Sequence, residues 1–141
     1  MRASWPTDTS QLVDAAGPGW AGLWSLLFTA ERAANALSQV ASFAEAMDLY
    51  WLGEQLHQPC DDVAVAHPGP VAAATAVDLG PVSETDGGEG ARRAIAGLLG
   101  AAIVRGDELL AEEQLWRDVE LLTASTASMF AARAHLVGSS R

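Results

Sequence analysis

The spacing of apolar and polar positions predicts helices along almost the whole chain. No segment of useful length alternates apolar and polar residues with a period of two, the pattern of a half-buried strand. Residues 20–57 contain neither proline nor a cluster of turn residues, and helix-forming Ala, Leu, Met, Glu and Gln dominate. We expect one long helix over 20–57. It should end ahead of Pro59, because the residue before a proline disfavours the helical conformation.

A second long helix is predicted over 91–137, where proline is again absent. Gly106 is followed by two acidic residues, which favour a helix N-terminus, so a break near Gly106 stays open. Residues 58–90 hold four of the six prolines and predict an acidic Pro/Gly linker. Residues 1–19 predict an N-terminal arm with a short helix that Gly17-Pro18 ends.

The apolar arcs of both long helices are wide. The first helix has one apolar stripe at 40, 43, 47 and 50, a polar stripe that includes Ser42 and Glu45, and a second apolar flank at Leu23, Leu27, Ala30, Ala34, Leu37 and Ala41. The second helix places four polar residues on the side expected to face solvent: Asp107, Gln114, Asp118 and Ser125. Two helices alone would leave apolar surface in water, so further helices must cover these arcs.

These patterns predict an all-α fold with a single helical domain over 1–141. We expect a long antiparallel helical hairpin, completed to a four-helix bundle by dimerisation. The alternative is a monomeric bundle, in which 8–16, 71–79 and a break near Gly106 supply the additional helices.

Charge narrows the classes of partner. The chain has 141 residues, 28 Ala, 8 Arg, no Lys and a formal net charge of −10. Nine acidic residues and no basic residue lie between Arg32 and Arg92. Nucleic-acid backbones and anionic membrane surfaces both select clustered basic residues, so we expect neither as a partner.

Cysteine and hydropathy patterns point to the cytoplasm. Cys60 is the only cysteine, which excludes an intramolecular disulfide and suits a reducing compartment. No apolar run of the kind found in a secretory signal follows the first residues. The longest apolar runs reach about half of the ~20 residues that span a bilayer. We therefore expect a cytoplasmic protein without membrane spans.

The best candidate for chemistry lies at the end of the first helix. Glu54 and His57 are three residues apart, so both project from one side of a helix. Cys60 and His67 add further donors, and this set suits iron or zinc. The alternative to a metal site is a solvated helix end, in which case no cofactor is expected.

Two short motifs carry resemblances. Glu54-x-x-His57 resembles the motif of ferritin-like di-iron carboxylate proteins, which implies a helical bundle with an iron site. That family carries a second such motif, which this chain lacks, so a second copy of the chain would have to supply it. Glu31 would take the place of the single glutamate that another helix contributes to the iron site in that family. Trp51-Leu52-Gly53 resembles small secreted helical hairpins of the W-x-G type, which implies a turn at that tripeptide.

Motifs for covalent and nucleotide chemistry are absent from the sequence. The chain has no G-x-S-x-G, P-loop or G-x-G-x-x-G motif. Asp61 and Asp62 beside Cys60 disfavour its thiolate, so a cysteine nucleophile is not expected. We assign no catalytic residue.

The sequence therefore favours a non-enzymatic helical interaction module, a small dimeric protein-binding or scaffold protein. The alternative is a metal-binding or di-iron ferritin-like helical bundle that uses Glu54 and His57. Large aromatic and apolar side chains are the usual anchors of such interfaces. The expected interface residues are Trp20, Trp24, Phe43, Met47, Tyr50, Trp51, Trp116 and Phe130.

Overall fold

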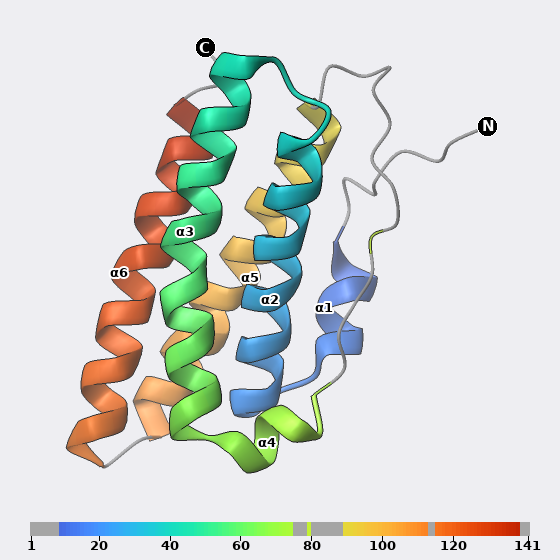
Figure 1. Ribbon diagram of the computed structural model, residues 1–141. Coiled ribbons are helices and arrows are strands. Elements are labelled where there is room, and N and C mark those ends of the chain that lie inside the picture. The colour runs from blue at the N-terminus through green and yellow to red at the C-terminus, as the bar shows by residue number, and fades with distance from the viewer. Residues whose placement is uncertain (1–8, 75–78, 80–88, 113–114, 139–141) are drawn as a thin grey trace.

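Four long helices lie side by side, and two short helices flank them (Figure 1). The computed structural model describes residues 9–74, 79, 89–112 and 115–138. Within these residues there is no strand, which confirms the all-α prediction. The helices are α1 (Ser10–Ala16), α2 (Gly19–Ser38), α3 (Phe43–Ala66), α4 (Pro68–Ala72), α5 (Glu89–Glu112) and α6 (Trp116–Gly138).

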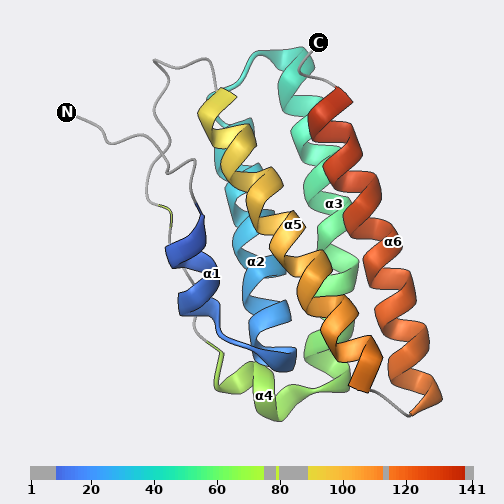
Figure 2. The same ribbon diagram turned by 180° about the vertical axis from the view of Figure 1, so that it is seen from behind.

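The four long helices form a bundle in which the helices that pack against each other are antiparallel. Helix α2 packs against α3 and α5, and α6 packs against α5 and α3. The chain runs up α2, down α3, again down α5 and up α6, as Figures 1 and 2 show. Helix α4 lies at one end of the bundle and α5 begins at the other. One long connection between two antiparallel helix pairs is also the connectivity of ferritin-like bundles.

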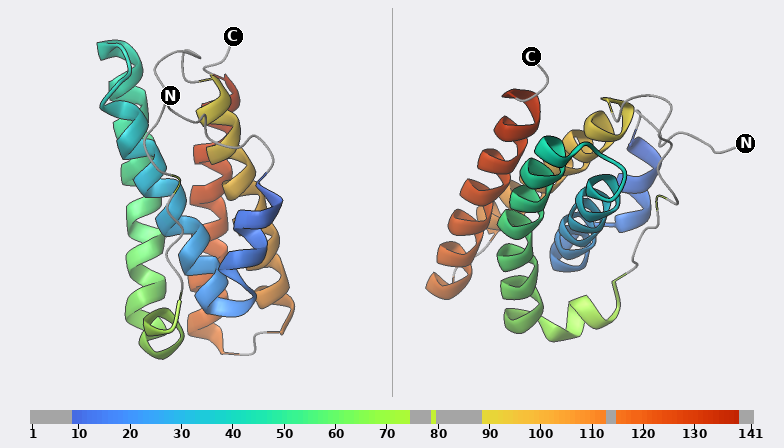
Figure 3. Two further views of the ribbon diagram at one scale, coloured as in Figure 1. Left: turned by 90° about the vertical axis from the view of Figure 1, so that its right-hand side faces the viewer. Right: turned by 45° about the horizontal axis from the view of Figure 1, so that its top comes forward.

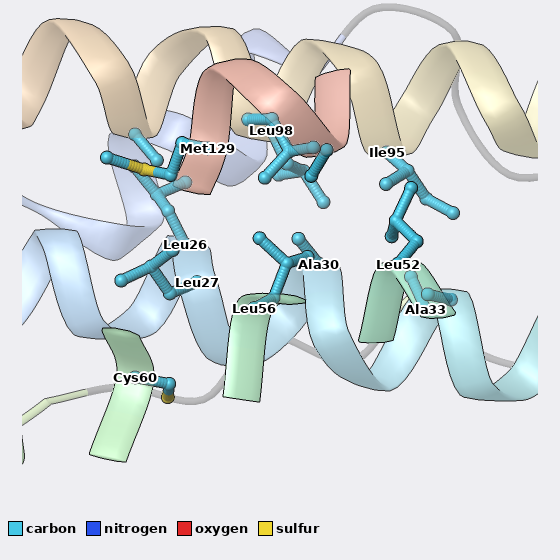
Figure 4. Close-up of a cluster of buried hydrophobic side chains, with 14 of the residues drawn as sticks. Leu26, Leu27, Ala30, Ala33, Leu52, Leu56, Cys60, Ile95, Leu98 and Met129 are labelled. Atoms are coloured by element: carbon cyan, nitrogen blue, oxygen red, sulfur yellow. The ribbon is translucent and has the colours of Figure 1, made fainter. Parts of the chain in front are cut away.

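One chain therefore supplies all four long helices. The expected single helix over 20–57 is wrong. The range 91–137, where the sequence leaves a break open, also holds two helices, and each range is folded back on itself as an antiparallel pair. The wide apolar arcs are covered largely by helices of the same chain, and a second copy is not needed to complete the bundle. The core contains fully buried leucines from all four helices, among them Leu27, Leu52, Leu98 and Leu122; part of it is drawn in Figure 4.

The turn between α2 and α3 is marked by a cap that the sequence prediction missed. Ser42 has an extended backbone, and its hydroxyl accepts a hydrogen bond from the Glu45 N–H at 3.5 Å. Serine at the N-cap followed by glutamate three residues later is a common helix start. The prediction placed both residues on a polar stripe within one helix, whereas they mark a helix boundary.

Helix α3 continues through Pro59, contrary to the prediction that it ends ahead of this residue. An interior proline removes one backbone hydrogen bond and costs about 3 kcal/mol. Here Pro59 is itself buried, and Cys60 and Val63 in the next turn pack into the core. Burial of this turn offsets the cost, so the first part of the predicted linker 58–90 is helical. The middle of that linker lies outside the described residues.

The break in the second predicted helix is not at Gly106. Helix α5 runs through Gly106 to Glu112, and α6 begins at Trp116. A Cβ atom at Gly106 would lie 3.3 Å from the Thr126 hydroxyl and 3.7 Å from the Met129 methyl carbon. The glycine is therefore explained by the close approach of α5 to α6, and not by a helix end.

The short N-terminal helix is confirmed. Helix α1 ends at Ala16, and Gly17 follows with φ of 79°, a conformation that favours glycine. The helix lies against α2 and α5, on the side of the bundle away from α6 (Figure 3). Across the described helices, none is both long enough and apolar enough to cross a membrane.

Candidate functional site

The most prominent surface feature is a row of large apolar side chains on the first half of α3. Phe43 is 84% exposed, Met47 56%, Tyr50 60% and Trp51 42%. Their spacing of four, three and one residues places them on one side of the helix. Among the described helices, none covers α3 on the viewer's side in Figure 1. We call these four residues the α3 apolar face.

The opposite side of α3 forms the core contact. Leu49, Leu52, Leu56 and Val63 are buried there. Both sides of the first half of α3 are therefore apolar, and only one can point into the bundle. The sequence identified the stripe at 43, 47 and 50 but did not show that it faces solvent.

One edge of the α3 apolar face contacts α6. The ring of Trp51 lies 4.7 Å from that of His135, centroid to centroid. His135 Nε2 lies 3.6 Å from Asp48 Oδ1, which brings α3 and α6 together at this level. Trp51 is thereby held by a neighbouring helix, whereas among the described residues the ring of Phe43 has no aromatic contact and is largely exposed.

Farther along the same side of α3, His57 meets Glu31 of α2. His57 Nδ1 lies 2.9 Å from Glu31 Oε1, so the imidazole N–H donates to the carboxylate. This hydrogen bond and the negative charge of Glu31 raise the pKa of His57 above its ordinary value of 6.5. Most of the His57 side chain is exposed, so this is a surface pair and not an interior site.

The Glu31–His57 pair predicts a measurable pH dependence. Because the folded-state pKa of His57 lies above 6.5, the pair stabilises the fold fully below that pH, and the stabilisation is lost as pH rises through the folded-state pKa. Titration of the His57 ring protons by NMR should show a raised pKa. Glu31→Gln should return it toward 6.5, and Glu54→Gln should change it less, because Glu54 makes the smaller contribution. An unchanged pKa in Glu31→Gln would contradict this account.

Cys60 belongs to the core. Its side chain is buried on the inner side of α3, within the cluster drawn in Figure 4. Burial, with smaller contributions from nearby Glu31 and Asp61, raises the pKa of the thiol to about 12. A thiol in this environment stays protonated at neutral pH, which disfavours a role as a nucleophile.

His67 joins three parts of the bundle. Its Nε2–H donates to Asp118 Oδ1 of α6 at 2.8 Å, and its ring stacks on Trp20 of α2 with centroids 3.8 Å apart. Asp118 is 1% exposed, although the sequence placed it on a wet surface. A buried carboxylate requires a partner, and His67 supplies it from a distant part of the chain. The pair fastens the α3–α4 junction to the start of α6.

The metal candidates are thus separated. His57 pairs with Glu31 at the surface, Glu54 is exposed, Cys60 is in the core, and His67 pairs with Asp118. Among the described residues, no three His, Cys, Asp or Glu side chains form a group that could hold a metal ion. The connectivity shared with ferritin-like bundles is therefore not accompanied by a converging set of donors in this part of the chain.

Of the remaining aromatic residues expected at an interface, one packs against the core and two are exposed. Trp24 stacks on Phe28 with ring centroids 4.7 Å apart, and both are partly buried against the core. Trp116 and Phe130 of α6 are exposed and far apart along that helix. The Trp51-Leu52-Gly53 tripeptide lies within α3 and not at a turn, so the hairpin turn implied by its resemblance is absent.

Comparison of the chain with models of protein families, with curated proteins and with solved structures finds no match.

Proposed function

We propose that this chain is a non-enzymatic interaction module that forms a homodimer through the α3 apolar face. The observation that supports this most is the exposure of Phe43, Met47, Tyr50 and Trp51 in one row. Solvation of such a row is unfavourable, and large exposed apolar patches usually mark interaction sites. The partner is a second copy of the chain, and the function is assembly or scaffolding.

The size of the face supports a dimer. A large side chain presents ~150–250 Å² of contact surface, so the observed exposed fractions sum to about 500 Å² per copy. Two copies together bury about 1,000 Å² from these side chains alone, which is the lower range of a specific interface. Residues around the face add to this area.

The composition of α3 also argues against nucleic acid as the partner. The helix carries five acidic residues and no Arg or Lys. The four residues of the α3 apolar face are uncharged, so apolar burial, and not attraction to phosphate, would drive association.

The proposal is tested by the mass of the protein in solution. Light scattering and sedimentation of the full chain over micromolar concentrations should show a reversible dimer. Met47→Glu places a charge within the interface and should raise the dissociation constant at least ~10-fold. The matched control is Val104→Glu on α5, because Val104 is also 56% exposed but lies outside the face.

Two results would overturn the proposal. A wild-type chain that remains monomeric throughout the concentration series has no dimer to explain. Equal dissociation constants for Met47→Glu and Val104→Glu would place the interface elsewhere.

A further inference from the structure

We infer that the two α3 helices of the dimer pack antiparallel, about a two-fold axis that passes close to Met47. This inference rests on the proposed function, because it specifies the geometry of the same interface. It is carried by the uneven distribution of apolar and acidic side chains along the exposed side of α3.

The large apolar side chains of this side gather in its first half, and Val65 is the exposed large apolar residue of the second half. Exposed apolar residues run from Val40, just before the helix, to Trp51, and Met47 lies near the middle of that stretch. An antiparallel pairing centred on Met47 places Phe43 opposite Trp51 of the partner subunit. It therefore covers the whole apolar stretch of both copies.

The acidic part of the same side begins directly afterwards. Glu54 and Asp61 follow at helical spacing, and both are exposed. In a parallel pair each residue lies opposite its own copy, so Glu54 would face Glu54 of the partner subunit and Asp61 would face Asp61 of the partner subunit. Like charges at such short distances are destabilising, and parallel helix dipoles add to the repulsion.

The antiparallel arrangement removes these like-charge pairs. Glu54 lies seven residues beyond Met47, about 10 Å along the axis, and Ser42 lies about 7.5 Å on the other side of it. Glu54 of each copy therefore reaches the N-terminal end of α3 in the other copy. Backbone N–H groups and the positive end of the helix dipole stabilise a carboxylate at this position.

The other acids of this half-helix do not oppose the pairing. Glu45 and Asp48 are displaced from Met47 by about 160° and 100° around the helix, outside the line of contact. Asp48 is moreover paired with His135 of its own chain. The contact line around Met47 carries uncharged side chains, those of Phe43, Ala44, Tyr50 and Trp51.

Disulfide cross-linking distinguishes the two geometries. Facing helices packed about 8–10 Å apart bring their nearest Cα atoms within the ~7 Å that a disulfide spans. Single cysteines are introduced into a Cys60→Ala background and oxidised with copper phenanthroline. Met47→Cys should form a cross-linked dimer. Phe43→Cys alone and Trp51→Cys alone should form no cross-linked dimer, because the same residue in the two copies is about 12 Å apart along the helix axis. A mixture of the two variants should cross-link, because residue 43 of one copy then faces residue 51 of the other.

The outcomes separate the inference from the proposed function. Self-cross-linking of Phe43→Cys and Glu54→Cys would show parallel packing and overturn the inference, while the dimer stands. A wild-type dimer in light scattering with no cross-link at any of these positions would also overturn it. A monomeric wild type removes both. Circular dichroism of each variant verifies that the helices are intact.

Discussion

Replacement of Leu56 by alanine should lower the free energy of unfolding by about 2–5 kcal/mol. Leu56 is fully buried on the inner side of α3, and Figure 4 shows its side chain among those of the other helices. The substitution removes three carbon atoms from the core and leaves a cavity that the surrounding helices fill only in part. Because the total stability of a domain is about 5–15 kcal/mol, this is a large fraction of it.

Urea denaturation followed by circular dichroism measures this effect. The matched control is Val65→Ala on the same helix, since Val65 is largely exposed and its replacement should change stability by less than ~0.5 kcal/mol. Equal losses for the two variants would contradict the assignment of the inner and outer sides of α3. That assignment is also the basis of the α3 apolar face.

Replacement of Gly22 by alanine should destabilise the protein by about 1–3 kcal/mol, against the usual preference for alanine in helices. A Cβ atom at Gly22 would overlap the carbonyl oxygen of Gly17, which is backbone and cannot turn aside as a flexible side chain does. Helix propensity favours alanine by about 1 kcal/mol, but the overlap requires the α1–α2 junction to move. The steric cost is therefore expected to exceed the gain in propensity.

Gly100 of α5 provides the comparison for this prediction. A Cβ atom there would meet only Arg133 Cζ, at an ordinary contact distance of 3.8 Å, so Gly100→Ala should be neutral or stabilising by up to about 1 kcal/mol. Thermal unfolding of both variants tests the pair. If Gly22→Ala raised the melting temperature as Gly100→Ala does, the close approach of Gly17 to Gly22 would be disproved.

The sequence predicted the helical class correctly and misplaced the boundaries. Helical spacing and the absence of alternation were enough for the class and for α1. The α2–α3 boundary was missed because Ser42 and Glu45 fit a polar stripe as well as they fit a cap. Pro59 was read by its local preference, whereas burial of the following turn decides the outcome. The sequence leaves open whether Gly106 breaks its helix, and the close contact of α5 with α6 explains this glycine.

The candidate site was predictable in composition but not in orientation. The spacing of Phe43, Met47 and Tyr50 identified a row of side chains. This row is exposed because the other apolar row of the same helix, which contains Leu52, packs into the core. Helical spacing alone does not rank two apolar rows on one helix. The partners of His57 and His67 lie 26 and 51 residues away in sequence, so no local pattern revealed them.

The order of the helices also affects how the chain reaches its fold. Contacts of α2 with α3, and of α5 with α6, join helices that follow one another in the chain, so closing each pair costs little loop entropy. Contacts of α2 with α5 and of α3 with α6 require the long connection to close first. We therefore expect the two helical hairpins to form first and to dock against each other later. Until docking, the part of the leucine side of α3 that packs against α6 is in water together with the α3 apolar face, so an early α2–α3 hairpin exposes apolar surface on two sides of one helix.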